Sequence, residues 1–199
     1  MEGLQTGLIR EVIVSDGGST DETLALAKAW GAEIVTGPAS RGGQLRRGCA
    51  AAQGDWILVL HADTQLTSGW SRPVAVHLAQ PAAAWFQLAF DGGGLAGRCV
   101  AAWANFRSRR GLPYGDQGLL ISKALYAQCG GFPDQPLMED VAIARALRGR
   151  LIGLDAVAVT SCEKYQRQGW IKRGARNLWT LIRYSAGTDP VILAKSYRR

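Results

Sequence analysis

The stretch WILVLHADT, residues 56–64, decides the fold class of this chain, because an apolar run ends there on a carboxylate. Residues 56–60 are apolar and have the length of a buried strand, and Asp63 follows them closely. In an open α/β sheet, ligands bind outside the carboxyl ends of the strands. Asp63 is therefore a candidate site residue on its position alone.

Two other acidic positions stand at the ends of expected elements. Asp16 follows a strand expected at residues 11–15, and the pair Glu139 and Asp140 opens an expected helix. Strands of one sheet bring their carboxyl ends to the same edge, where a shared crevice forms. The sequence therefore predicts a single crevice that holds a metal ion and a phosphorylated substrate.

Strand-like apolar runs alternate with helix-like segments, which is typical of an α/β fold with a mostly parallel sheet flanked by helices. The expected strands are residues 12–14, 33–36, 56–60, 84–90, 118–122 and 156–160. The expected helices are residues 19–30, 44–53, 68–77, 95–110 and 141–148, the first opened by a Ser19/Glu22 capping box and the third by Ser68. We expect a single domain at residues 1–162, followed by a basic, aromatic helical segment at residues 163–199.

The composition is that of an ordinary enzyme, since 199 residues with 47% hydrophobic content are enough for one core. The sequence shows neither an apolar run of about 18 residues nor a basic-then-apolar start, so we expect no membrane span and no secretion signal. A cytoplasmic location follows. Scattered cysteines without a CxxC pair favour reduced, mostly buried thiols; they are Cys49, Cys99, Cys129 and Cys162.

The chain is basic, with a net charge of +7 and an isoelectric point of about 9.6. This charge favours an anionic partner, which is a nucleotide, a phosphorylated acceptor, a membrane surface or nucleic acid. No nucleic-acid recognition module accompanies the charge, so we do not expect nucleic acid as a partner.

Four motifs occur in order: SDGGSTDET at residues 15–23, LHADT at 60–64, GDQG at 115–118 and GGFPDQPLMEDV at 130–141. Together they resemble family 2 glycosyltransferases of the Rossmann-like GT-A fold, and small bacterial members linked to arsenosugar biosynthesis resemble the chain most. The resemblance implies transfer of a sugar, with inversion, from a UDP- or GDP-type donor to an unidentified acceptor hydroxyl. It also implies a divalent cation, Mg²⁺ or Mn²⁺, and it leaves a homo-oligomer open.

The resemblance assigns the cation to Asp63, which matches the last carboxylate of the family's Asp-x-Asp motif. Carboxylate oxygens are ligands that suit Mg²⁺ and Mn²⁺. His61 replaces the first aspartate of that motif, and His61 and Ala62 are expected on the nucleotide-sugar. The alternatives are that Asp63 caps the next turn and that His61 is a satisfied, half-buried imidazole.

Asp16 matches the position where the family holds the base or ribose, and Gly17 lets the backbone approach a flat ligand. The alternative is an Asx turn at the same residues. Arg41, in a glycine-flanked loop, is a candidate contact of the diphosphate, and the alternative is a solvated loop arginine.

Asp140 matches the family's catalytic aspartate, which removes the acceptor's proton as general base, and Glu139 is expected to orient the acceptor or a loop. Two acids in the first turn of a helix are also what the helix dipole favours without catalysis. Asp116 and Gln117 of GDQG are expected to hydrogen-bond the acceptor, with a tight turn as the alternative.

The chain departs from the family at its start, where only residues 1–10 precede the first expected strand. Family members open with a strand and a nucleotide-contacting loop, so the N-terminal strand is expected to be missing or supplied from elsewhere. A truncated, noncatalytic nucleotide-sugar-binding module is one alternative function, and a nucleotidyltransferase is another. The basic aromatic residues 164–183 suit either an interfacial helix at the inner membrane face, near a lipid-linked acceptor, or a helix packed on the domain.

Overall fold

The structure is a computed structural model that describes residues 2–197. Met1 and residues 198–199, at the ends of the expected 1–162 domain and 163–199 segment, lie outside the described residues. The strands are β1 (Ile13–Asp16), β2 (Glu33–Thr36), β3 (Trp56–Val59), β4 (Thr64–Leu66), β5 (Ala83–Phe90), β6 (Leu119–Ser122) and β7 (Leu151–Thr160). The helices are α1 (Glu2–Gln5), α2 (Thr23–Ala29), α3 (Arg41–Ala51), α4 (Ser71–His77), α5 (Gly94–Arg109), α6 (Lys123–Gln128), α7 (Glu139–Ala146), α8 (Glu163–Gln168), α9 (Trp170–Ser185) and α10 (Pro190–Tyr197), with a 3₁₀ turn η1 (Gly115–Gln117).

The strands form two sheets. The larger one has the order β3-β6-β5-β7-β4, and the smaller one consists of β1 and β2. The predicted α/β class is confirmed, but the pairing is more mixed than mostly parallel. Only β1–β2 and β5–β7 are parallel, because β6 and β4 run against their neighbours in the three other pairs.

Alternating side chains of β6 divide the core between the two faces of the large sheet. Leu119 and Ile121 pack with α3, α6 and α7, while Leu120 packs with α4 and with Phe86 of β5. The period of two along a strand explains this division, since successive side chains point to opposite faces. The site described below lies beside α7, on the first of these faces.

The two sheets are not joined by a backbone ladder in the part of the chain that the structure describes. Helix α3 contacts β1, β2 and β3, so side-chain packing holds the pieces together. Residues 2–5 form the short helix α1 where the resemblance places a strand. The carboxyl ends of β1 and β3 therefore belong to separate sheets.

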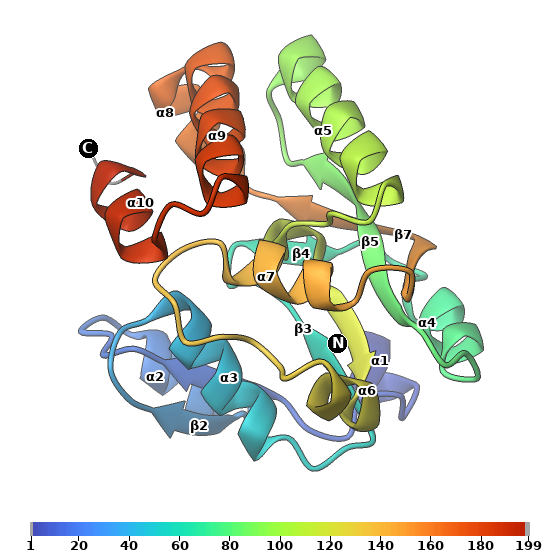
Figure 1. Cartoon of the computed structure of the whole chain (residues 1–199). Coiled ribbons are helices and arrows are strands. Elements are labelled where there is room, and N and C mark those ends of the chain that lie inside the picture. Colours follow the sequence, from blue (N-terminus) through green and yellow to red (C-terminus); the bar gives the residue numbers. More distant parts are fainter. Residues whose placement is uncertain (1, 198–199) are drawn as a thin grey trace.

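The polypeptide after β7 forms α8, α9 and α10; α9 contacts α5, and α8 and α9 stand at the end of the molecule opposite β2 and α2 (Figure 1). Leu193 of α10 is fully buried against Leu137, Met138 and Val141. Trp170 of α9 packs against Phe90 at the end of β5, with ring centroids 5.2 Å apart. No helix within residues 2–197 is long and apolar enough to cross a membrane.

Two local expectations about helix starts and one about the cysteines are wrong. The predicted capping box does not form, because the Ser19 hydroxyl donates to Asp16 Oδ1 at 2.5 Å and α2 begins only at Thr23. Ser68 does not cap α4, whose N-cap position is Trp70. Of the cysteines, only Cys49 and Cys162 are buried, and Cys99 is exposed on α5.

Candidate active site

The end of β3 delivers Asp63 to a polar pocket, where it meets a lysine from α8. Asp63 Oδ2 and Lys164 Nζ are 3.0 Å apart, and both side chains are partly exposed. Partial burial acts to raise the pKa of Asp63, but the hydrogen bond and charge of Lys164 outweigh it and lower the pKa. Asp63 is therefore an ionised carboxylate at neutral pH.

His61 lies in the same pocket and packs against the backbone of η1. A Cβ atom on Gly115 would lie 2.4 Å from the His61 ring, so glycine is required for this contact. Burial and the nearby Arg41 lower the pKa of His61 below its usual value, with Asp140 and Asp63 opposing them. The imidazole is therefore neutral at pH 7.

Arg41 is the first residue of α3, and it pairs with Glu139 at the start of α7. Arg41 Nε donates to Glu139 Oε1 at 2.8 Å, and the Glu139 side chain is almost fully buried. Burial and the neighbouring Asp140 raise the pKa of Glu139, against the opposing charge of Arg41. Glu139 Oε2 is buried with no hydrogen-bond partner within residues 2–197. Glu139 thus holds Arg41 at the pocket edge.

A close backbone contact fixes this arginine further. Gly42 N donates to Gln135 O at 3.1 Å, and a Cβ atom on Gly42 would lie 1.9 Å from Pro133 O. Ser40, the N-cap of α3, donates its hydroxyl to Asp134 Oδ1 at 2.7 Å. The start of α3 and the loop before α7 therefore form a clamp, which we call the α3 clamp.

Asp140 lies at the second position of α7 and points into the pocket. Its Oδ2 accepts from Gly115 N at 2.9 Å, and its Oδ1 accepts from Val141 N at 2.7 Å. Each ionised carboxylate oxygen accepts more than one hydrogen bond, so both keep capacity for a substrate hydroxyl. Met138, just before the helix, has φ of 64° and is the one non-glycine with positive φ within residues 2–197. Such strained backbone clusters at functional sites.

Asp116 of η1 adds a third carboxylate. Its Oδ1 is buried with no hydrogen-bond partner in the part of the chain that the structure describes. Burial raises the pKa of Asp116 to about 6, Arg107 opposes the shift, and Asp140 and Asp63 add to it. Burial also raises the pKa of Tyr114 to about 12, and the Arg107 guanidinium lies 3.3 Å from the centroid of its ring.

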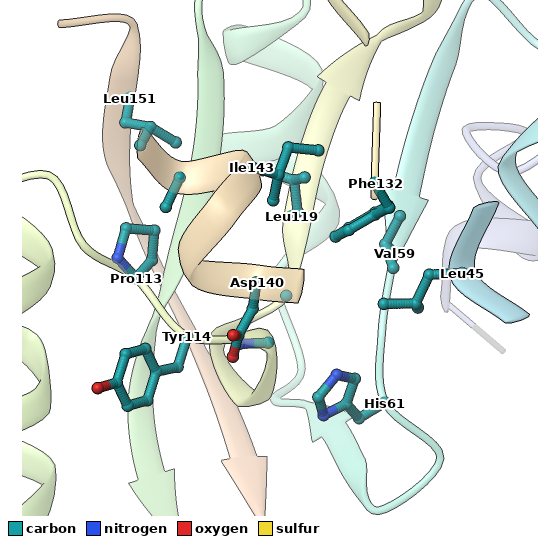
Figure 2. Close-up of a pocket in the computed structure, with 13 residues that line it drawn as sticks. Leu45, Val59, His61, Pro113, Tyr114, Leu119, Phe132, Asp140, Ile143 and Leu151 are labelled. Atoms are coloured by element: carbon teal, nitrogen blue, oxygen red, sulfur yellow. The ribbon is translucent and has the colours of Figure 1, made fainter. Parts of the chain in front are cut away.

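The polar pocket is lined by the expected residues Arg41, His61, Asp63, Asp116 and Asp140. An adjoining apolar pocket shares His61, Tyr114 and Asp140 with it. Figure 2 shows the Asp140 carboxylate near Tyr114, at the end of α7 away from the apolar side chains of Leu119 and Ile143. The pocket thus combines an acidic and basic rim with an apolar floor.

Five expected residues do not line either pocket: Asp16, Gly17, Ala62, Gln117 and Glu139, the last of which acts through Arg41. Asp16 accepts hydrogen bonds from Gly18 N and from Ser19, so the residues form the Asx turn that was the alternative expectation. These bonds lower the pKa of the Asp16 carboxyl, and the bond from the Ser19 hydroxyl contributes most. Gln117 is fully buried; its Nε2 donates to Phe86 O, and its Oε1 accepts from the Ser108 hydroxyl. Gln117 braces the fold rather than facing the pocket.

Five pocket residues come from the C-terminal helices and were not predicted individually from the sequence: Lys164, Tyr165, Arg173, Asn177 and Tyr197. They come from α8, α9 and α10, so the segment after β7 closes the pocket. The basic character of residues 164–183 was the available signal, but a sequence does not tell which lysine reaches Asp63.

A divalent cation has a limited set of ligands here. No group of three or more His, Cys, Asp or Glu within residues 2–197 is arranged to hold a metal ion. Mg²⁺ in nucleotide sites, however, is commonly held by one or two carboxylates together with substrate phosphates. The ionised Asp63 fits that pattern, with the remaining ligands supplied by a diphosphate and water.

Three acidic and three basic side chains gather around one pocket of this α/β domain, and such a polar concave pocket is the default candidate for a ligand site. The family model described as Glycosyl transferase family 2 matches residues 4–118, more than half of the chain. The chain therefore belongs to glycosyl transferase family 2.

Solved structures agree with this fold. S. aureus TarS 1-349 in complex with UDP superposes with a TM-score of 0.55 at 17% identity, covering 79% of this chain and 53% of TarS. GalNAc-T7 with UDP, GalNAc and Mn²⁺ gives a TM-score of 0.54 at 12% identity, covering 76% of this chain and 37% of GalNAc-T7. The chain thus spans about half or less of these two structures. No curated protein sequence matches it.

Proposed function

We propose that the chain transfers a sugar from a nucleotide-diphosphate donor of the UDP or GDP type to an acceptor hydroxyl. The observation that carries the proposal is one pocket in which Asp63, Asp140 and Arg41 meet beside Lys164. Family membership supports the reaction class. The solved structures of TarS and GalNAc-T7 hold UDP, and GalNAc-T7 also holds Mn²⁺.

On the donor side, Lys164 and Arg41 carry the positive charge that a diphosphate requires. Both line the pocket with Asp63, so the diphosphate lies between them in this proposal. Asp63 would hold a Mg²⁺ or Mn²⁺ ion, which would supply positive charge against the leaving diphosphate. His61, neutral and packed on Gly115, faces the donor, and Asp16 at the end of β1 holds the base or ribose.

On the acceptor side, Asp140 acts as general base and takes the proton of the attacking hydroxyl. Its two oxygens are fixed by Gly115 N and Val141 N, so the carboxylate is oriented before substrate binds. Attack from the face opposite the leaving diphosphate inverts the anomeric carbon. Glu139 positions Arg41, and Asp116, one oxygen of which has no hydrogen-bond partner among residues 2–197, receives an acceptor hydroxyl.

Calorimetry tests the donor step directly. We expect UDP or GDP to bind the purified chain more tightly with Mn²⁺ than without it, since cation and carboxylate act together. Slow release of free sugar from a panel of nucleotide-sugars then reports the chemistry without a known acceptor. Absence of binding to every nucleotide, with and without metal, would contradict the proposal.

One observation favours a binding module without catalysis. Within residues 2–197 no backbone ladder joins the sheet that contains Asp16 to the sheet whose strand β3 leads to Asp63, so side-chain packing, including that of α3, holds the proposed base and diphosphate sites together. Nucleotide binding with no sugar release under any donor would favour this second candidate. Assignment to the subfamily linked to arsenosugar biosynthesis stays a prediction.

A further inference from the structure

Helices α5 and α9 each carry an exposed apolar stripe with helical spacing. On α9 the stripe contains Ile171, Leu178, Trp179 and Ile182, and Ile171 is 89% exposed. On α5 it contains Leu95, Trp103 and Phe106, and Leu95 is 77% exposed. Scattered exposed apolar residues need no explanation, but contiguous apolar stripes of this kind mark an interaction surface.

The two stripes belong to one end of the molecule. Trp170, at the start of α9, lies against the start of α5, where a Cβ atom on Gly93 would lie 2.1 Å from its ring. Figure 1 shows α5 and α9 standing side by side, at the end opposite α2. We call the stripes of the two helices together the α5/α9 surface.

The positive charge of the chain is concentrated in the two segments that contain α5 and α9, where Lys164 and Arg173 line the polar pocket and other basic side chains are exposed. Residues 92–115 and 164–188 contain ten of the 23 Lys and Arg residues and none of the 16 Asp and Glu residues. Without these two segments, acidic residues outnumber basic ones. Arg98 and Lys172 are exposed members of the set. The partner of the surface must therefore be anionic as well as apolar.

We propose that the α5/α9 surface binds the face of an anionic phospholipid bilayer. Helices with an apolar stripe bordered by Lys and Arg lie in the interface of such membranes, where apolar side chains enter and basic ones meet the headgroups. A second copy of the chain fits less well, because a two-fold contact would place the basic border against itself. Binding to nucleic acid would not account for the exposed apolar side chains of Ile171 and Leu95.

The side of α9 opposite the apolar stripe lines the polar pocket, which suggests how the surface could serve the reaction. This step rests on the proposed transferase function. Arg173 and Asn177 line the polar pocket, two and six residues after the outward-facing Ile171. A bilayer beneath α5 and α9 therefore lies next to the wall of the pocket. The acceptor that this position favours is a hydroxyl presented at the membrane surface, on a lipid or a lipid-linked sugar.

Vesicle flotation without nucleotide tests the surface separately from the transferase function. We expect the chain to bind vesicles of phosphatidylcholine with 30 mol% phosphatidylglycerol, to bind phosphatidylcholine alone weakly, and to be released as salt screens the charge. The paired change Arg98→Glu and Lys172→Glu should lower partitioning at least about tenfold, because each basic residue near the surface contributes. Trp103→Ala with Trp179→Ala should lower it by about tenfold, because two large apolar side chains no longer insert.

Matched controls lie at the other end of the molecule. Trp30 is 67% exposed and Lys28 is exposed, both at the end of α2, so Trp30→Ala and Lys28→Glu should partition like the parent. Absence of binding to anionic vesicles at low salt would overturn the inference, as would equal losses in the α2 variants. A dimer that Trp179→Ala dissociates would overturn it in favour of a second copy. UDP calorimetry on each variant reports the proposed function independently.

Discussion

At the scale of single residues, Asp63 is the partner of Lys164, and the proposed function also makes it the ligand of a cation; these two roles exclude each other. Asp63→Asn removes the charge that attracts a cation and keeps the shape, so Mn²⁺-dependent UDP affinity should fall by about tenfold or more. Lys164→Ala is the matched comparison: it removes the competing ammonium and leaves the carboxylate, so UDP binding should weaken but keep its Mn²⁺ dependence. Calorimetry with and without Mn²⁺ measures both. Equal Mn²⁺ dependence in Asp63→Asn and parent would remove Asp63 from the cation site.

The proposed role of Asp140 as general base can be tested separately from donor binding. Asp140→Asn keeps the side chain's size but removes the proton acceptor, so kcat should fall by about 10²- to 10⁴-fold while UDP affinity stays near the parent value. Glu139→Gln should instead weaken UDP binding, because it releases Arg41. Parental turnover in Asp140→Asn would show that this residue only caps α7.

Asp116 makes the stability of the chain depend on pH. Its folded pKa of about 6 lies above the ordinary 3.8, so the folded state is penalised once pH rises above both values and the penalty disappears as pH falls through 6 toward 4. Asp116→Asn should therefore be more stable than the parent by about 1–3 kcal/mol at pH 7.5, and by little at pH 4. Urea unfolding without metal or nucleotide measures the difference. A variant less stable at pH 7.5 would mean that the carboxylate is well solvated or paired.

At the scale of elements, the sequence predicts best where the apolar pattern is unambiguous. The strand predicted at residues 33–36 is β2, and the helix predicted at 95–110 is α5 within one residue at each end. The short elements α1, η1, β4 and α6 were missed. The pattern of β4 is set by its pairing with β7, and that of α6 by its packing on the core around Leu125. The predicted capping box failed for a similar reason, since the Asp16 carboxylate competes for the Ser19 hydroxyl.

In the candidate site too, residues with a clear local sequence signal could be predicted, and residues brought in by tertiary packing could not. Asp63, His61 and Asp140 could be placed because each follows or opens an element that the pattern predicts, and Asp116 because it belongs to the GDQG motif. Arg41 was expected in a loop, but it is the first residue of α3. Lys164 and Asn177 could not be placed, because only the folded position of α8 and α9 brings them to the strand ends. Gln117 was misplaced because one residue's step around η1 turns it from the pocket to the interior.

The α3 clamp gives a prediction for a whole element. Gly42→Ala places a methyl group against Pro133 O, so the start of α3 and the loop before α7 must separate, at a cost of about 1–3 kcal/mol. UDP affinity should fall with it, because Arg41 moves from Glu139. Gly174→Ala on α9, which has open space at its Cβ, is the control and should raise stability by up to about 1 kcal/mol. Urea unfolding measures the change in stability, and calorimetry measures the change in UDP affinity. Unchanged UDP affinity in Gly42→Ala would show that the α3 clamp does not contribute to the donor site.

At the scale of the whole molecule, the two sheets differ in how they are held. Strand β5 is paired on both sides, with β6 and β7, whereas β1 is paired only with β2 among residues 2–197. Side-chain packing by α3 connects β1 to the rest, with Ile13 against the core cluster that contains Ile57. Elements with fewer backbone partners open at lower free energy, so the β1–β2 unit should open before the large sheet.

Amide hydrogen exchange tests this difference in stability. We expect amides of β1 and β2 to exchange at least about tenfold faster than those of β5 and β7, because local opening exposes them without global unfolding. Adding UDP with Mn²⁺ should slow exchange in β1 more than in β7, since a ligand that bridges Asp16 and Asp63 binds only the closed arrangement. Exchange at one common rate would mean that the sheets unfold together. Slowing confined to β7 and α8 would place the whole nucleotide on the Asp63 side and remove Asp16 from the donor site.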